Sequence, residues 1–308
     1  MLSIVIVNWN VRDLLDACLA SIFASTLDAE SYEIIVVDSA STDGSTDMLR
    51  QKYPSVILLP QAENIGFTRG NNLGLAQAMG DFLFLLNPDT ELCPTALAQL
   101  LDYMQANPAV GILGPHTLNT DGSHQSTRRR FPTLITGIFE STWLSFWAPA
   151  AVERDYRLLD TGDKNIIEVD WVQGSAFLLR REVYQDIGGL DDGYIMYYEE
   201  LDYCRRAKSA GWQIVYHGGA KITHHGGKSS EQASAFKHIH FQTSKLRYFR
   251  VHHGYGAYIF LRALLLILFG WQLILESFKG MLGHKRELRT ERVRTYWQVL
   301  RSGLKAKL

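Results

Sequence analysis

The run Ser3-Ile-Val-Ile-Val-Asn8 decides how the rest of the sequence is interpreted. Its four consecutive β-branched residues indicate a buried strand that ends on a polar side chain. Similar apolar runs follow at Glu33–Val37, Val56–Leu59 and Phe82–Leu86, and stretches with helical periodicity separate them. Because strands that alternate with helices are typical of parallel βαβ units, the sequence predicts an α/β fold with a mostly parallel central sheet.

The composition fits a folded protein with a large core. The chain has 308 residues, of which 46% are hydrophobic and 20% are charged. The three cysteines lack the spacing of a metal site or of a disulfide framework, which favours reduced thiols. No basic stretch followed by a cleavable apolar run precedes the first strand, so we expect the catalytic part to be cytoplasmic. Residues 114–170 lose their regularity, and we expect long loops there.

The C-terminal part differs from the rest in charge and in hydropathy. Residues 231–308 carry 14 lysines and arginines against 4 aspartates and glutamates, whereas residues 1–230 carry 17 against 28. We therefore predict two domains, 1–230 and 231–308. A basic segment favours contact with anionic lipid head groups or nucleic acid, although a solvated helical face has the same composition.

The apolar stretch Tyr258–Leu275 is nearly long enough to span a membrane, and Arg262 near its end could reach the interface. The basic segment that follows, Lys285–Lys307, also contains aromatic residues, which favours a helix lying in the membrane interface. Packing of both segments on the domain or on a second subunit is the alternative.

Polar residues follow three of the expected strands. Asn8 and Asp38 come at the ends of the first two, and Asn87-Pro88-Asp89 follows the run Phe82–Leu86. The carboxyl ends of parallel strands meet at one sheet edge, where ligands bind. Asp89 there would supply a hard oxygen ligand for Mg²⁺ or Mn²⁺, with diphosphate oxygens completing the shell.

Three further groups have suitable chemistry. Asp43, in Asp43-Gly-Ser45, could help to fix a nucleotide or could only shape a turn. Glu199 and Glu200 could remove a proton from an attacking hydroxyl, or they could be the acidic first turn of a solvated helix. His224 precedes a glycine-rich basic loop and could bind a metal or a diphosphate, a role that suits His225 less.

Taken in order, these elements resemble the family 2 glycosyltransferases of the GT-A fold, in particular the bacterial rhamnosyltransferase-like members. The resemblance runs from about residue 2 to 255. It rests on Ser3–Asn8, Val37–Ser45, Glu63–Asn72, Leu86–Asp89, Arg129–Pro132, Gly174, Gly188–Asp191, Tyr197–Asp202 and His224–Ser229.

The resemblance implies a role for each matching position. Asp38 and Asp43 would belong to the nucleotide site, Asp89 would be the acid of a DxD-type metal motif in which Asn87 replaces the first aspartate, and His224 would complete the metal or diphosphate site. Glu200, or else Glu199, would be the general base. The remaining binding residues would be Asn8, Asn64, Gly66, Gly70, Asn71, Asn72, Arg129 and Arg130.

The function that follows is the transfer of a sugar, with inversion, from a nucleoside diphosphate donor such as a thymidine or uridine diphosphate sugar. The resemblance alone suggests L-rhamnose as the sugar and a lipid-linked saccharide as the acceptor, in cell-surface polysaccharide synthesis. We expect Mg²⁺ or Mn²⁺ as cofactor, an anionic membrane surface but no nucleic acid as partner, and a place at the cytoplasmic face of the inner membrane. The oligomeric state stays open.

Two alternatives belong to other classes. A sugar nucleotidyltransferase should carry a glycine-rich, basic loop near its N-terminus, and residues 8–14 lack one. A non-catalytic sugar-nucleotide-binding subunit would not need Glu199 and Glu200.

Overall fold

The computed structural model describes residues 1–226, 234–283 and 285–306, which form two compact units. Unit 1 comprises residues 1–131, 157–192 and 199–229, and unit 2 comprises residues 132–156, 193–198 and 230–308. The helical C-terminal region therefore shares its unit with two earlier segments of the chain. The predicted division at residue 230 stays a prediction.

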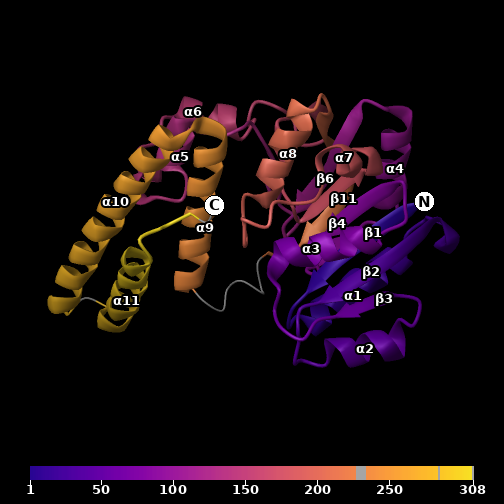
Figure 1. The fold of residues 1–308 in the computed structure, drawn as a ribbon, viewed down its shortest axis with the longest axis horizontal. Helices are drawn as coiled ribbons and strands as arrows, with labels where there is room; N and C mark the ends of the chain where they lie inside the picture. Colours follow the sequence, from indigo (N-terminus) through magenta and orange to yellow (C-terminus); the bar gives the residue numbers. More distant parts are fainter. Residues whose placement is uncertain (227–233, 284, 307–308) are drawn as a thin grey trace. The chain divides into compact units, whose positions relative to one another are not determined.

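Unit 1 is built on a mixed, mostly parallel sheet (Figure 1). In the described residues the sheet order is β3 (Ile57–Pro60), β2 (Tyr32–Asp38), β1 (Leu2–Asn8), β4 (Phe82–Leu86), β10 (Ala176–Arg180), β6 (Val110–Leu118), β11 (Gln213–His224) and β5 (Thr90–Leu92), and β8 (Ile166–Glu168) also pairs with β11. Strands β1 to β4 run parallel to one another, and β6 runs parallel to β11, whereas β10 is antiparallel to β4 and β6, and β5 and β8 are antiparallel to β11. The predicted α/β fold is confirmed.

Helices cover both faces of this sheet, because side chains of each strand alternate between two cores. Ile4 and Ile6 of β1 belong to one cluster, whereas Val5 between them belongs to the other. The first cluster includes apolar residues of α1 (Arg12–Phe23), α2 (Ser45–Lys52) and α4 (Ala96–Ala106), and the second those of α3 (Gly66–Gln77), α7 (Arg181–Ile187) and α8 (Glu199–Ser209).

Helix α3 approaches β1 closely because two of its glycines face the strand. A Cβ atom added to Gly70 would lie 2.7 Å from Val7 Cγ1, and one added to Gly74 would lie 2.3 Å from Val5 Cγ1. Since a close-packed core has no room for these atoms, both positions require glycine as long as valine occupies positions 7 and 5.

The four strands expected before residue 90 match β1 to β4 to within one residue at each end, and Phe82–Leu86 matches β4 completely. The expectation of long loops over residues 114–170 was wrong for much of that stretch. It contains the end of β6, strand β7 (Arg128–Arg129), strand β8, and helices α5 (Leu134–Phe139) and α6 (Ala150–Tyr156), and β7 pairs with β9 (Trp171–Val172) just after it. Short elements without a clear period give little signal in a sequence.

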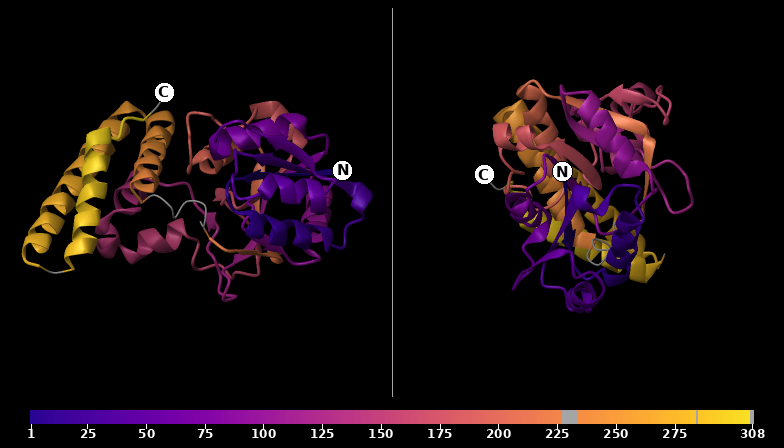
Figure 2. Two further views of the ribbon diagram at one scale, coloured as in Figure 1. Left: turned by 90° about the horizontal axis from the view of Figure 1, so that it is seen from below. Right: turned by 90° about the vertical axis from the view of Figure 1, so that its right-hand side faces the viewer.

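In unit 2 three long helices lie side by side: α9 (Ser234–His253), α10 (Tyr255–Met281) and α11 (Arg286–Ser302) (Figure 2). Lys245 of α9 is fully buried and donates hydrogen bonds to the carbonyls of Gly137 and Glu140, at 3.1 and 2.8 Å, which hold α9 against the end of α5. Burial lowers the pKa of Lys245 to about 8, although Glu140 opposes this shift.

Candidate functional site

Asn8 and Asp38 lie side by side where β1 and β2 end. The two residues are paired in the parallel register, and both are buried. Asn8 Nδ2 donates to Asp38 Oδ2 at 2.7 Å, and the Ser41 N–H donates to Asp38 Oδ1 at 2.9 Å. Each carboxylate oxygen can accept a second hydrogen bond, so Asp38 could also bind a nucleotide, as the resemblance implies. That role stays a prediction.

Asp43 joins the beginnings of two helices. Its Oδ2 accepts from the Arg12 N–H at 2.8 Å, and its Oδ1 accepts from the N–H and hydroxyl of Ser45 at 3.0 and 2.6 Å. Burial raises the pKa of Asp43, but these hydrogen bonds outweigh burial and the net shift is downward. Asp43 therefore shapes the local structure, which is one of the two roles that the sequence allowed for it. Its role in binding a nucleotide stays a prediction.

Asp89 and His224 come together because β5 pairs with β11 in the antiparallel sense. The register sets His224 opposite Thr90, and the His225 N–H donates to the Asp89 carbonyl at 2.8 Å. Both side chains are buried, and His224 Nε2 lies 3.3 Å from Asp89 Oδ1. His225 turns elsewhere, since its Nε2 lies 2.7 Å from Glu91 Oε1.

The Asp89–His224 pair fits a divalent cation. His224 Nε2 is buried without a hydrogen-bond partner, whereas Nδ1 lies 2.8 Å from Gln125 Oε1. A ring nitrogen and a carboxylate oxygen therefore face the same point. Across the part of the chain that the structure describes, no group of three or more histidine, cysteine, aspartate or glutamate side chains could hold a metal ion. A cation bound by two side chains leaves positions for diphosphate oxygens and water.

Glu200 is connected to the turn that carries Asp89 through two neighbouring residues, Gly174 and Ser175. The Gly174 N–H is 3.4 Å from Glu200 Oε1, and the neighbouring Ser175 accepts the Asn87 N–H at 2.9 Å through its carbonyl. These two hydrogen bonds, made by adjacent residues, connect Glu200 to the turn that carries Asp89.

Glu199 and Glu200 begin α8 and have different surroundings. Glu199 is 5% exposed, and burial followed by the adjacent Glu200 carboxylate raises the pKa of Glu199 well above its usual range. Asp202, in the same turn, pairs with Arg206 at 2.8 Å, and Arg206 also donates to the Ile187 and Gly189 carbonyls.

The stretch from Asn64 to Asn72, where the resemblance implies binding residues, makes its side-chain hydrogen bonds within unit 1. Asn64 Oδ1 accepts from the Gly66 N–H at 2.9 Å, and Gly66 has a φ of +78° that favours glycine. Asn71 donates to the Phe67 carbonyl. Asn72 exchanges hydrogen bonds of 2.8 Å with the backbone of Leu190. A donor-binding role for these residues, and for Gly70, stays a prediction.

Arg129 and Arg130 have different contacts. Arg129 donates to Ser126 Oγ at 2.7 Å and lies over the Trp171 ring, whereas Arg130 is half exposed, 4.0 Å from Asp170 Oδ1. Both stay predicted diphosphate or acceptor contacts. Arg128 is instead buried in a 2.9 Å ion pair with Asp163.

Sequence reasoning missed Gln125, which contacts His224 although 99 positions separate them. No local pattern marks it. Only the pairing of β11 with β6 brings the two segments together.

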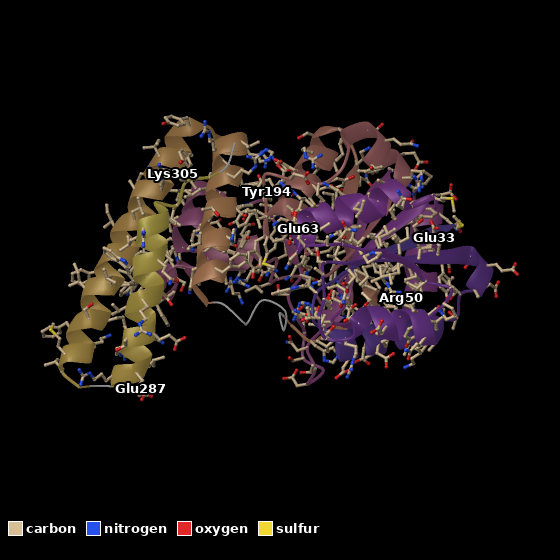
Figure 3. The ribbon with its side chains drawn as sticks, turned by 60° about the horizontal axis from the view of Figure 1, so that its bottom comes forward. Glu33, Arg50, Glu63, Tyr194, Glu287 and Lys305 are labelled. Atoms are coloured by element: carbon tan, nitrogen blue, oxygen red, sulfur yellow. The ribbon has the colours of Figure 1, made fainter. Side chains whose placement is uncertain are left out.

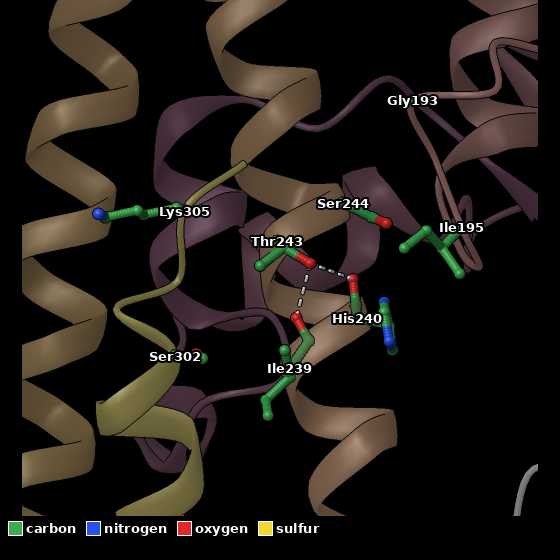
Figure 4. Close-up of a pocket in the computed structure, with 8 residues that line it drawn as sticks. All are labelled: Gly193, Ile195, Ile239, His240, Thr243, Ser244, Ser302 and Lys305. Atoms are coloured by element: carbon green, nitrogen blue, oxygen red, sulfur yellow. Dashed lines mark hydrogen bonds between the residues drawn. The ribbon is translucent and has the colours of Figure 1, made fainter. Parts of the chain in front are cut away.

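A cavity of about 140 Å³ occurs within unit 2, and none of the predicted site residues lines it (Figure 4). The hydroxyls of Thr243 and Ser244 in its wall already donate to backbone carbonyls. It is lined by Gly193, Ile195, Ile239, His240, Thr243, Ser244, Ser302 and Lys305.

The model of the family "Glycosyl transferase family 2" matches residues 3–188. The chain belongs to this family. It is 32% identical over 238 residues to N-acetylglucosaminyl-diphospho-decaprenol L-rhamnosyltransferase of Mycobacterium tuberculosis, covering 73% of this chain and 76% of the relative. It is 26% identical over 224 residues to rhamnosyltransferase WbbL of Escherichia coli, covering 70% of this chain and 80% of that one.

Among solved structures, a mannosyltransferase of Pyrobaculum calidifontis in complex with GDP-Man and Mn²⁺ has a TM-score of 0.59 at 16% identity, covering 98% of this chain and 84% of the other. This likeness confirms the GT-A fold. The chain is thus a family 2 glycosyltransferase of the rhamnosyltransferase-like kind, as the resemblance implied.

The raised pKa of Glu199 predicts how Glu199→Gln changes stability with pH. The folded chain holds the Glu199 proton more tightly than the unfolded chain, in which the pKa is near 4.5, so ionising Glu199 destabilises the fold as pH rises above that value. As the pH rises, the free energy of unfolding of Glu199→Gln should increase relative to that of wild type by up to about 1.4 kcal/mol per pH unit. The increase should stop once the pH exceeds the pKa of Glu199 in the folded protein. Urea unfolding in EDTA over a pH series measures this difference.

The exposed Glu182→Gln is the matched control and should follow wild type at every pH. A difference between Glu199→Gln and wild type that does not change with pH would contradict the prediction.

Proposed function

We propose that this glycosyltransferase moves L-rhamnose, with inversion, from a nucleoside diphosphate donor to a hydroxyl of a lipid-linked saccharide in cell-surface polysaccharide synthesis. The names of its relatives in Mycobacterium tuberculosis and Escherichia coli support rhamnose, and the first of these names contains a decaprenyl diphosphate-linked sugar. A thermal-shift screen of thymidine and uridine diphosphate sugars tests the donor, because a ligand at 100 times its dissociation constant stabilises by about 2.7 kcal/mol.

The observation that supports this proposal is the 3.3 Å approach of His224 Nε2 to Asp89 Oδ1, together with the hydrogen bonds of Gly174 and Ser175 that link Glu200 to the turn carrying Asp89. Asp38 would orient the base of the donor, while Asp89 and His224 would hold a divalent cation against its diphosphate. The cation, when bound, stabilises the negative charge that builds on the leaving diphosphate. Glu200 would take the acceptor proton as that oxygen attacks the anomeric carbon from the face opposite the leaving group, which inverts the configuration.

We also propose that the enzyme works at the cytoplasmic face of the membrane with α10 lying in the interface. Helix α10 is long and apolar enough to cross a bilayer, and 28% of its most apolar window is buried. Six exposed apolar residues recur along it at spacings of three, four or seven, and we call them the outward stripe. They are Phe260, Ile267, Trp271, Ile274, Phe278 and Met281.

Helix α11 favours the in-plane position over a spanning one. It packs along α10, with Arg289 paired to the buried Glu276 at one end and Arg262 Nε donating to the Gly303 carbonyl at 2.8 Å at the other. A spanning α10 would therefore draw the charged residues of α11 into the hydrocarbon, which is strongly unfavourable. Figure 3 shows one of them, Glu287, at the beginning of α11.

The outer face of α11 suits an anionic surface. Arg286, Arg294 and Arg301 are exposed at helical spacing, with exposed Trp297 between the last two. Arginine with tryptophan on one face is typical of helices that bind anionic lipid head groups.

Depth measurements along the outward stripe test this placement. Phe260→Cys, Ile267→Cys and Ile274→Cys are made singly in a Cys93→Ser background, because Cys93 is the exposed cysteine whereas Cys18 and Cys204 are buried. Each is labelled with a fluorophore, and quenching by brominated lipids in phosphatidylglycerol vesicles should give the same shallow depth at all three sites. A maximum of depth at position 267 would indicate a spanning helix, and no quenching at any site would remove the membrane contact.

Asp89→Ala should lose the cation while keeping the fold. We expect sugar transfer to fall by at least about a hundredfold, because the charge on the leaving diphosphate is no longer neutralised. Release of nucleoside diphosphate and calorimetric Mn²⁺ binding measure the two effects, with Asp186→Ala as a control in the same unit. Turnover like that of wild type at saturating Mn²⁺ would remove the metal site.

Glu200→Gln should lose transfer but keep the donor. The amide cannot accept the proton of the acceptor, so we expect kcat to fall by about 10²–10⁴. Donor binding, followed by thermal shift, should stay close to that of wild type. If Glu199→Gln is the inactive variant instead, the base is Glu199.

A further inference from the structure

His224 ends a chain of side-chain hydrogen bonds that begins on a turn of unit 1. The turn follows β6 and spans Asn119 to Ser123, closed by the Ser123 carbonyl accepting the Asn119 N–H at 2.8 Å. Gln125, two residues later, reaches His224. None of these residues touches the proposed cation position directly, yet their hydrogen bonds decide which nitrogen of His224 carries a proton.

The direction of donation along these hydrogen bonds is defined because they start at a carboxylate. When it is ionised, a carboxylate can accept hydrogen bonds but cannot donate them. Ser123 donates through its hydroxyl at 2.6 Å and its N–H at 2.9 Å to Asp121 Oδ1. These hydrogen bonds lower the pKa of Asp121, so its carboxylate is ionised at neutral pH. With its proton committed to Asp121, the Ser123 hydroxyl can only accept from Asn119 Nδ2, which lies 2.9 Å away.

The direction then passes through two amides. Asn119 uses Nδ2 toward Ser123, so its Oδ1 faces Gln125 and accepts from Gln125 Nε2 at 3.0 Å. Gln125 in turn presents Oε1 to His224 Nδ1 at 2.8 Å. An oxygen at that distance requires a proton on Nδ1. Neutral His224 therefore keeps its lone pair on Nε2, the nitrogen that lies 3.3 Å from Asp89 Oδ1.

We propose that Gln125 is a positioning residue that fixes His224 as the Nδ1-protonated tautomer, with Asn119, Ser123 and Asp121 fixing Gln125 in its turn. This inference rests on the proposed metal site and extends it outward. Hydrogen bonds to the second nitrogen of a histidine ligand fix its ring orientation and tautomer, and losing them commonly weakens metal affinity by about 10–100-fold. The turn after β6 is thus part of the cation site, although it supplies no ligand.

Removing the acceptor tests the proposal by metal affinity. Gln125→Leu cannot accept from Nδ1 and should weaken Mn²⁺ binding, measured by calorimetry on the full chain, by about 10–100-fold. Gln125→Glu keeps an oxygen toward Nδ1 and should retain most of the affinity. Thr120→Ala, at an exposed position of the same turn, should bind like wild type. Affinity unchanged in Gln125→Leu would overturn the proposal.

The tautomer itself gives a readout that a merely structural role of Gln125 would not change. In the metal-free protein, ¹⁵N shifts of labelled histidine, with His224→Gln to assign the signal, should show a proton on Nδ1 in wild type and in Gln125→Glu. Gln125→Leu should show a shift toward the other tautomer. A proton on Nε2 in metal-free wild type would refute the inference.

Asp89→Ala separates failure of this inference from failure of the metal site. If Asp89→Ala binds Mn²⁺ like wild type, the metal site itself is wrong. If Asp89→Ala no longer binds Mn²⁺ while Gln125→Leu binds it like wild type, the metal site stands and only the positioning role of Gln125 is wrong.

Discussion

The approach of His224 to Asp89 is the contact on which the proposed chemistry depends. It exists because β5, only three residues long, pairs with the end of β11 and brings a turn after one strand against the last residue of another. Both groups are buried, and burying a carboxylate next to an imidazole nitrogen costs free energy unless a proton or a cation lies between them. Hydrogen bonds of Gly174 and Ser175 connect Glu200 to the turn that carries Asp89.

The sequence predicts the parallel strands and the location of Asp38 and Asp89 well, because both depend on local pattern. An apolar run that stops on a polar residue marks a strand end, and parallel strands share an edge. Gln125 could not be predicted this way. Its partner lies on β11, and which oxygen or nitrogen of its amide faces His224 follows only from a chain of contacts back to Asp121.

Other residues were ambiguous because one side chain can serve local structure and a ligand alike. Asp43 binds the beginnings of α1 and α2, and Asn72 exchanges hydrogen bonds with Leu190, although both lie in stretches that resemble the family. Residues 132–156 posed a different difficulty. They form short helices of unit 2, and their partners on α9 and α10 come more than a hundred positions later, so no local pattern indicates them.

The glycines of α3 limit how this protein can change in evolution. Gly74 and Val5 occupy a space in which one added methyl group would lie 2.3 Å from the valine. A larger residue at position 74 is therefore tolerated only when position 5 becomes smaller in the same lineage. Because α3 packs on β1 at these two positions, an increase in size at one of them alone would separate the helix from the strand.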